Sequence, residues 1–278
     1  MQVLLLGGHG KVALHLTPLL LARAWNVTSV IRNPDHESEI LALAKGANAK
    51  GKLNVLISSL DDIKTEADAA KILADTDPDY VVWSAGAGGK GGPSRTIAID
   101  ETAAQNFISA AYARPRVTKF LLVSWLGSRR NRPSWFSDED WAASQNVFTN
   151  VLPTYAKAKL EADEFLTAHA AVRAQKLATG ARLSPLQAIC LRPGTLTDDP
   201  ATGKVSLGKT RGQGKVTRED VARVADALLA RDDTQGWYDL LGGEEEIGKA
   251  VDRVAKEGFD AVVGEDVEAM VERFGLDS

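Results

Sequence analysis

A tyrosine and a lysine at close spacing could move a proton in this chain. Tyr155 and Lys159 lie four positions apart at the start of segment 155–174, whose apolar spacing predicts a helix, so their side chains share one helix face. Tyrosine can act as a proton donor, and Ser124 ends an expected strand that precedes this segment. The Tyr-x-x-x-Lys pattern often arises by chance, but its place between that strand and one ending in Arg-Pro-Gly gives it weight. The alternative is a structural tyrosine at the mouth of a pocket.

A glycine-rich turn near residue 7 could bind a diphosphate. Its residues are Gly7, Gly8, His9, Gly10, Lys11 and Val12. Gly7 permits a tight turn, Gly10 lets a pyrophosphate approach the main chain, and the small Ala13 lets the next helix pack on the preceding strand. That helix would present unpaired N–H groups and a positive dipole end to the phosphates. The alternative is a glycine-rich turn that binds nothing.

Alternating strands and helices must position these residues. Apolar runs predict strands at 3–6, 27–32, 53–60, 80–83, 119–124, 186–191 and 237–241. Helical patterns fall at 14–23, 37–45, 67–73, 97–113, 155–174, 218–229, 247–255 and 267–274, with a further possible strand at 204–207. This alternation predicts an α/β fold: a doubly wound parallel sheet of Rossmann type with a small C-terminal substrate-side lobe.

We expect a single domain over residues 1–278. It comprises a cofactor half at about 1–126, an insertion at about 127–153 and the C-terminal lobe at about 193–278. The insertion carries the aromatic residues Trp135, Phe136, Trp141 and Phe148. These rings either wall a pocket or only pack the insertion onto the domain. The insertion also holds Arg129, Arg130 and Arg132, which predict a solvated loop, with an anionic-substrate site as the alternative.

Composition narrows the class of protein. A formal charge of −4 gives no support for nucleic-acid binding. The single cysteine, Cys190, excludes an internal disulfide framework, and its apolar surroundings predict a buried, inert thiol. No signal pattern and no apolar run of membrane-spanning length are seen, so we expect no membrane association and a cytoplasmic location. The four histidines lack ligand-like spacing, which predicts no metal, and the missing Gly-x-Ser-x-Gly disfavours an α/β-hydrolase.

The sequence resembles the short-chain dehydrogenase/reductase superfamily. It looks most like the atypical, single-domain members, a group that includes NmrA-like and biliverdin-reductase-B-like proteins. The matching segments, in the family's order, are 7–13, 31–34, 84–88, 99–100, 122–124, 155–159, 192–198 and 217–222. The resemblance covers most of the chain and is more specific for the fold and the cofactor than for the reaction.

The resemblance implies roles for the residues that could move a proton. Lys159 would bind the nicotinamide ribose and, as a cation, lower the pKa of Tyr155 from about 10 toward operating pH. Tyr155 would then protonate a carbonyl oxygen as hydride arrives, while Ser124 hydrogen-bonds the same oxygen. Asp100 stands where typical reductases carry an asparagine, as atypical members often do. A carboxylate there would stabilise the charged Lys159 yet oppose formation of tyrosinate.

Arg32, at the end of the second expected strand, favours NADP(H) over NAD(H). Enzymes that prefer NAD place a carboxylate there to accept the ribose hydroxyls. Arg32 instead offers a fork of donors to a 2′-phosphate, followed by Asn33 rather than by an acid. Lys11 could add a second positive charge. The alternatives are a surface arginine and an exposed helix lysine.

Further cofactor contacts follow from the resemblance. The family usually has an adenine-binding aspartate near the end of strand three, and here Ser59 takes that place, so the adenine contact is expected at Ser59 and Leu60. Additional cofactor contacts are expected from Ala85, Gly86, Ala87, Pro193, Gly194, Thr195 and Leu196. The substrate pocket would be bounded by 87–92, Trp125, the insertion and the segment after Asp198.

The leading hypothesis is an NADPH-dependent oxidoreductase that transfers hydride to a carbonyl-type group of a small, fairly apolar substrate, with Tyr155 as the proton donor. One alternative is a non-catalytic NADP(H)-binding sensor or regulatory protein of NmrA type. Another is a nucleotide-sugar epimerase, which shares the glycine motif but is disfavoured because the C-terminal lobe looks small for a nucleotide-sugar. The expected partner is a small-molecule substrate.

Overall fold

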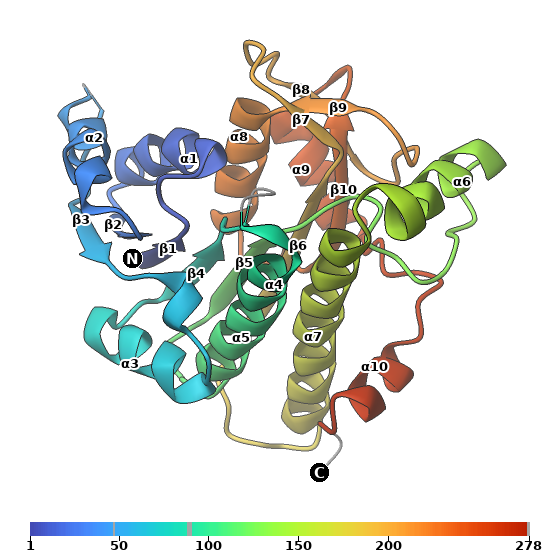
Figure 1. The fold of residues 1–278 in the computed structure, drawn as a ribbon, viewed down its shortest axis with the longest axis horizontal. Coiled ribbons are helices and arrows are strands. Elements are labelled where there is room, and N and C mark those ends of the chain that lie inside the picture. Colours follow the sequence, from blue (N-terminus) through green and yellow to red (C-terminus); the bar gives the residue numbers. More distant parts are fainter. Residues whose placement is uncertain (47, 88–90, 277–278) are drawn as a thin grey trace.

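The computed structural model describes residues 1–46, 48–87 and 91–276 (Figure 1). Among them, nine strands form one sheet in the order β11-β8-β10-β6-β5-β4-β1-β2-β3. The parallel strands are β1 (Gln2–Leu6), β2 (Asn26–Ile31), β3 (Leu53–Ile57), β4 (Tyr80–Trp83), β5 (Lys119–Val123), β6 (Gln187–Pro193) and β10 (Gly236–Gly242). Two antiparallel strands, β8 (Lys204–Gly208) and β11 (Glu245–Glu246), extend one edge. The predicted doubly wound parallel sheet is confirmed.

Helices cover both faces of the sheet. One face carries α1 (Lys11–Ala22), α8 (Arg218–Leu229) and α9 (Ile247–Lys256). The other carries α3 (Glu66–Thr76), α5 (Ala104–Tyr112) and α7 (Pro153–Ala178), of which α5 and α7 lie side by side in Figure 1. The strands read as apolar runs because both of their faces are buried. In β4, Val81 and Trp83 join one core and Val82 joins the other.

Shorter elements complete the fold. They are α2 (Glu37–Ala42), α10 (Val267–Arg273), which packs against α7, and the one-turn 3₁₀ helices η1 (Pro34–His36), η2 (Leu43–Lys45) and η3 (Leu60–Asp62). Strands β7 (Thr195–Thr197) and β9 (Lys215–Thr217) pair in a separate two-stranded sheet. Of the expected C-terminal lobe, β8, β10 and β11 therefore belong to the main sheet, whereas β7 and β9 stand apart.

The strand order reverses between β1 and β4, which are hydrogen-bonded neighbours. The connections that leave two such strands run to opposite faces of the sheet, so a crevice opens beyond their carboxyl ends. The glycine turn after β1 and the loop after β4 both lie at this edge. The topology thus places the predicted diphosphate site where doubly wound sheets bind their ligands.

Two elements begin or end earlier than predicted. The third strand was expected to reach residue 60 but stops at Ile57, because the Ser59 hydroxyl accepts the N–H of Asp61 and starts η3. The helix expected at 97–113 begins earlier, at Gly92: α4 (Gly92–Thr96) runs into the π-helical η4 (Ile97–Ala103) and then into α5. A π-helical turn widens a helix and is frequent at functional sites. Asp100 lies within η4.

The insertion is helical and packs on the sheet. It holds α6 (Asp138–Asn146) and the π-helical η5 (Val147–Val151). Ser137 caps α6, where its hydroxyl accepts the N–H of Asp140 at 3.0 Å. Phe136 is buried against Leu126 and Leu241, so this ring fastens the insertion to the end of the sheet.

The prediction of a solvated arginine loop was wrong for Arg129. Its guanidinium is fully buried and donates from Nη2 to Asp239 Oδ2 at 2.7 Å. Asp239, on β10, also accepts from Nε of the buried Arg192 at 3.0 Å. A buried guanidinium requires a carboxylate partner, and the sequence places that partner 110 residues away. Arg130 is closer to the expectation: its side chain is partly exposed, although it donates from Nε to the buried carboxylate of Glu164 at 2.6 Å.

Replacement of Asp239 by alanine should destabilise the protein strongly, because it leaves two buried guanidinium groups without a shared carboxylate. We expect the free energy of unfolding to fall by about 3–5 kcal/mol. Denaturant unfolding measures the change. The matched control is Asp252→Ala, which removes an exposed partner of Arg231 and should cost less than about 1 kcal/mol. Equal losses in the two variants would show that the buried network contributes no more than a surface pair.

Candidate functional site

The turn between β1 and α1 accepts only glycine at several positions. Gly7 has φ +81°, and a Cβ on it would lie 2.6 Å from the Cα of Ala85. A Cβ on Gly8 would lie 1.7 Å from the hydroxyl oxygen of Ser29. Gly10, the residue before α1, carries no side chain that could cap the helix, so the first N–H groups of α1 are left for another acceptor. These features fit a bound diphosphate.

A cavity of about 260 Å³ opens beside this turn, at the predicted edge of the sheet. Its lining brings together the predicted residues Gly7, His9, Gly10, Arg32, Asn33, Leu60, Ala85, Gly86 and Ala87. It also includes Val30, Ile31, His36, Ser58, Asp61, Ser84, Arg95 and Ile99, which sequence reasoning did not assign to the site. The lining contains the groups expected of an adenosine-diphosphate site, since it combines glycines of the turn with charged side chains.

Some predicted cofactor residues lie apart from this cavity. Lys11 is exposed and forms an ion pair with Asp198, which also pairs with Arg218 at 2.6 Å. Val12 is buried in the core under α1, so only its backbone faces the turn. The described lining does not include Ser59, whose hydroxyl is engaged with Asp61. Contacts from these three residues to a cofactor stay predictions.

The predicted catalytic residues converge where β5 ends and α7 begins. Lys159 Nζ lies 3.0 Å from Asp100 Oδ1 and 3.4 Å from the carbonyl oxygen of Val123. The same Nζ is 5.8 Å from the centre of the Tyr155 ring. Ser124 follows Val123 directly and is buried, and its hydroxyl meets no hydrogen-bond partner among the described residues. A buried hydroxyl without a partner is the kind of group that a bound substrate could satisfy.

Asp100 connects the two parts of the site. Its Oδ2 accepts the backbone N–H of Ala87 at 2.9 Å, while its Oδ1 faces Lys159. Ala87 belongs to the loop after β4 that lines the cavity beside the glycine turn. We refer to this cavity as the candidate dinucleotide cavity, or dinucleotide cavity for short. A Cβ on Gly86 would lie 3.0 Å from Asp100 Oδ1, so the loop also needs glycine to sit this close. One carboxylate thus holds both the cofactor-side loop and the lysine.

The charges around Tyr155 keep it protonated. Burial raises the pKa of Tyr155, Lys159 lowers it, and Asp100 and Asp163 raise it again, so the net shift is upward. Burial lowers the pKa of Lys159, but Asp100 and Tyr155 raise it more, and the lysine stays charged. Lys159 lowers the Tyr155 pKa as expected, but burial, which has the largest effect, outweighs it together with Asp100 and Asp163, so the pKa does not fall toward operating pH.

Asp163 is a site residue that sequence reasoning missed. It follows Tyr155 and Lys159 at successive four-residue steps on α7, and that spacing was the available signal. Its Oδ2 accepts from Arg192 Nη1 at 2.8 Å, and both side chains are fully buried. Burial raises the pKa of Asp163, while Arg192 opposes the shift. Its other oxygen, Oδ1, has no hydrogen-bond partner among the described residues.

A second cavity of about 290 Å³ has Trp125, the residue after Ser124, in its wall. It is lined by Trp125, Leu126, Ala143, Ser144, Val147, Gly194, Thr195, Gly212, Gln213, Gly214 and Lys215. The insertion thus both walls a pocket, through α6 and η5, and packs on the sheet through Phe136. The rings of Trp125 and Tyr155 lie 6.2 Å apart, which joins this cavity to the predicted catalytic residues. We refer to it as the candidate substrate cavity.

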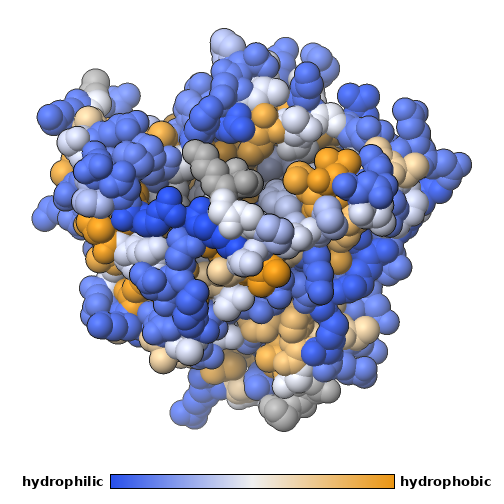
Figure 2. Space-filling model, viewed as in Figure 1, coloured by the Kyte–Doolittle hydropathy of each residue, from blue (hydrophilic) through white to orange (hydrophobic). Residues whose placement is uncertain are grey.

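The surface near α6 and η5 is partly hydrophobic. Figure 2 shows a hollow near the centre of this face and hydrophobic side chains between the hollow and α6. Val151 and Leu152, at the end of η5, are among the exposed large apolar residues. Residues 88–90 of the pocket boundary expected at 87–92 lie outside the described residues. The predicted contribution of the segment after Asp198 agrees with the lining residues Gly212 to Lys215.

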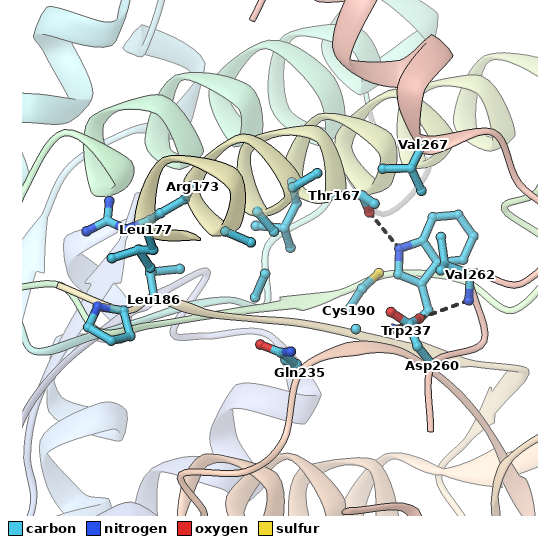
Figure 3. Close-up of a pocket in the computed structure, with 17 residues that line it drawn as sticks. Thr167, Arg173, Leu177, Leu186, Cys190, Gln235, Trp237, Asp260, Val262 and Val267 are labelled. Carbon is cyan, nitrogen blue, oxygen red and sulfur yellow. Dashed lines mark hydrogen bonds between the residues drawn. The ribbon is translucent and has the colours of Figure 1, made fainter. Parts of the chain in front are cut away.

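A third cavity, of about 300 Å³, lies between α7 and strands β6 and β10 (Figure 3). Trp237 forms one wall and donates from Nε1 to Thr167 at 2.8 Å. Cys190 lies in the same lining, and burial raises the pKa of its thiol, which confirms the predicted buried, unreactive cysteine. The described lining contains none of the predicted site residues, so this cavity is separate from the site.

No helix in the described part of the chain is long and apolar enough to span a membrane. Within the same residues, no group of three or more His, Cys, Asp and Glu side chains could hold a metal ion.

The chain belongs to the NAD(P)H-binding family, whose model matches residues 7–232. A UPF0659 protein of Schizosaccharomyces pombe is 32% identical over 88% of this chain and 91% of its own length. A Bacillus subtilis protein named an uncharacterized sugar epimerase, YhfK, is 28% identical over 91% of this chain and its full length.

Solved structures of similar fold agree with this assignment. A putative NAD-dependent epimerase/dehydratase from Bacillus halodurans superposes with a TM-score of 0.68 and 26% identity, covering 91% of this chain and 99% of its own. ChuY, an anaerobilin reductase from Escherichia coli, superposes with a TM-score of 0.61 and 22% identity, covering 88% and 99%. Together with the family match, they confirm the resemblance to atypical NAD(P)-binding proteins of short-chain dehydrogenase/reductase type.

Replacement of Asp100 by asparagine should lower the pKa of Tyr155. The amide keeps an oxygen that can accept the Ala87 N–H but removes the negative charge that opposes tyrosinate. A pH titration of tyrosinate absorbance, with Tyr155→Phe identifying the signal of this residue, measures the shift. A Tyr155 titration at the same pH in wild type and variant would show that Asp100 does not control the tyrosine.

Proposed function

We propose that this protein is an NADPH-dependent oxidoreductase that reduces a carbonyl-type group on a small, fairly apolar molecule. The observation that supports this best is the position of Tyr155 and Lys159 between the two cavities. Asp100 connects the lysine to the loop that lines the dinucleotide cavity. Trp125 connects the tyrosine to the candidate substrate cavity. Bound NADPH would supply the hydride. The backbone of the glycine turn would hold its diphosphate, and Gly194 and Thr195 would face its nicotinamide end.

The chain's own residues supply the proton chemistry. Tyr155 is held protonated, so its hydroxyl is ready to donate to an oxygen that gains negative charge. Lys159 is a fixed cation that stabilises the tyrosinate left behind. Ser124 offers a hydroxyl without a described partner to the same oxygen. A protonated donor beside a fixed cation suits reduction better than oxidation, because reduction begins with the proton on the enzyme.

The candidate substrate cavity supports a small and fairly apolar substrate. Trp125, Leu126 and Val147 provide apolar walls, and the glycines leave room between them. Among the described residues, Lys215 is the one ionisable side chain in this lining. This is little charge for a site that would bind the diphosphate of a nucleotide-sugar.

Two other functions stay as alternatives. The name of the Bacillus subtilis relative favours sugar epimerisation as the second candidate. The raised pKa of Tyr155 favours a non-catalytic NADP(H)-binding sensor, because a tyrosine that resists ionisation is a weaker acid. A cytoplasmic location, expected from the single cysteine, belongs to this proposal as well.

Tyr155→Phe should lower kcat for NADPH oxidation by about 10²–10⁴-fold, because general acid catalysis contributes that much, and should leave NADPH binding unchanged. The assay is loss of NADPH absorbance with a panel of aldehydes, ketones and quinones. The matched control is Tyr112→Phe, which removes a buried hydroxyl outside the site. Binding without turnover of any carbonyl would favour the sensor, and conversion of a nucleotide-sugar would favour the epimerase.

Arg32→Ala should weaken NADPH binding by about 10–100-fold, which corresponds to loss of a charged hydrogen bond of about 1.5–3 kcal/mol, and should leave NADH binding nearly unchanged. Fluorescence titration of both reduced cofactors measures the effect. The reason is that only NADPH carries the 2′-phosphate that Arg32 would contact. Equal weakening for the two cofactors would remove the basis for NADPH preference.

A further inference from the structure

Two arginines from distant parts of the chain converge on one aspartate in the wall of the dinucleotide cavity. Arg95, in α4, reaches Asp61 with Nε at 2.8 Å from Oδ1 and Nη2 at 3.1 Å from Oδ2. Arg32, at the end of β2, reaches Oδ2 of the same carboxylate from Nη1 at 3.3 Å. Asp61 lies in η3, just beyond β3. Arg32 and Asp61 thus come from the ends of the neighbouring strands β2 and β3, and Arg95 comes from helix α4.

This cluster lies in the cavity that holds the glycine turn. Arg32, Asp61 and Arg95 line it together with Gly7 and Gly10. None of the three charged side chains is fully buried, and the exposed fraction is 58% for Arg32, 31% for Asp61 and 23% for Arg95. Hydrogen bonds from Arg95 and Arg32 hold the pKa of Asp61 below its usual range, so it is charged at neutral pH. Two cations and one anion leave a net positive charge at an accessible place.

The geometry is that of an anion site with one anion already in it. Two guanidinium groups on a single carboxylate form the forked arrangement that also binds phosphate. A carboxylate at the adenosine ribose has the opposite preference, because it accepts the 2′-hydroxyl of NAD and repels a 2′-phosphate. The cluster therefore combines both kinds of recognition in one place.

We propose that Arg95 acts with Arg32 to bind the 2′-phosphate of NADP(H), and that Asp61 limits this preference by competing for the same guanidinium groups. This inference rests on the proposed function, since it assumes that a dinucleotide lies in this cavity. It adds Arg95 and Asp61 as specificity-determining residues, which the position of Arg32 alone does not indicate.

The test is calorimetric binding of 2′,5′-ADP and 5′-AMP to the full chain, because these nucleotides differ only in the 2′-phosphate. Arg95→Gln should weaken 2′,5′-ADP binding about tenfold, as expected for loss of one charge-assisted hydrogen bond, and leave 5′-AMP nearly unchanged. Asp61→Asn should tighten 2′,5′-ADP several-fold and weaken 5′-AMP. Arg95→Lys should lie between wild type and Arg95→Gln, since it keeps the charge and loses the fork.

The matched controls are Arg23→Gln and Asp226→Asn. They break an arginine–aspartate pair of similar geometry between α1 and α8, with nitrogen–oxygen distances of 2.6 and 2.9 Å, outside the described lining of the cavity. They should change neither affinity. Thermal melting of every variant checks that the fold is kept.

The results separate three claims: the proposed cofactor site, the role of Arg95 and the role of Asp61. If wild type binds neither nucleotide, the proposed cofactor site and this inference fall together. If wild type prefers 2′,5′-ADP and Arg32→Ala removes the preference but Arg95→Gln does not, the role of Arg95 is wrong and the proposed function stands. If Asp61→Asn weakens 2′,5′-ADP, Asp61 orients the arginines and its competing role is overturned.

Discussion

The buried charge of Arg192 has to be paired with carboxylates, and this requirement fixes how the elements that form the site are arranged. Its guanidinium has no exposed surface, lies 3.9 Å from the centre of the Trp237 ring, and bonds Asp163 at 2.8 Å and Asp239 at 3.0 Å. It also donates to the carbonyl of Ser128 at 2.8 Å. An unpaired charge in such surroundings would cost several kcal/mol. Helix α7, strand β10 and the loop after β5 therefore have to meet at β6.

This requirement sets the rotation of α7. Asp163 must face Arg192, and residues four and eight positions earlier lie on the same side of the helix. Lys159 and Tyr155 are consequently turned toward the end of β5, where Asp100 and Val123 meet the lysine. The buried ion pairs thus position the proposed proton donor without touching a substrate. A helix held by apolar contacts alone could turn slightly at little cost, whereas a paired charge has one well-defined place.

Sequence patterns predicted the parts of the fold that depend on local spacing. The first strand, the glycine turn and the helix after it follow from burial on both strand faces and from backbone geometry at Gly7. The Tyr155–Lys159 pair follows from helical periodicity. Patterns failed where the partner is remote in sequence: Asp61 and Arg95 are 34 positions apart, and Arg129 and Asp239 are 110 apart. Nothing near Arg129 distinguishes it from a solvated arginine until β10 supplies its carboxylate.

The carboxylate of Asp100 acts on the loop at Ala87, on Lys159 and on Tyr155. An asparagine there could hold the loop through Ala87 but would not keep Lys159 paired at 3.0 Å with a charge. With aspartate, Lys159 is paired within the protein. Burial raises the pKa of Tyr155 most, and Asp100 and Asp163 raise it further against the opposing charge of Lys159. The cost is a weaker tendency to form tyrosinate, and the gain is a proton held firmly on the hydroxyl until an acceptor with developing negative charge is present. The site therefore keeps the proton on Tyr155, which is the protonation state from which the proposed reduction would begin.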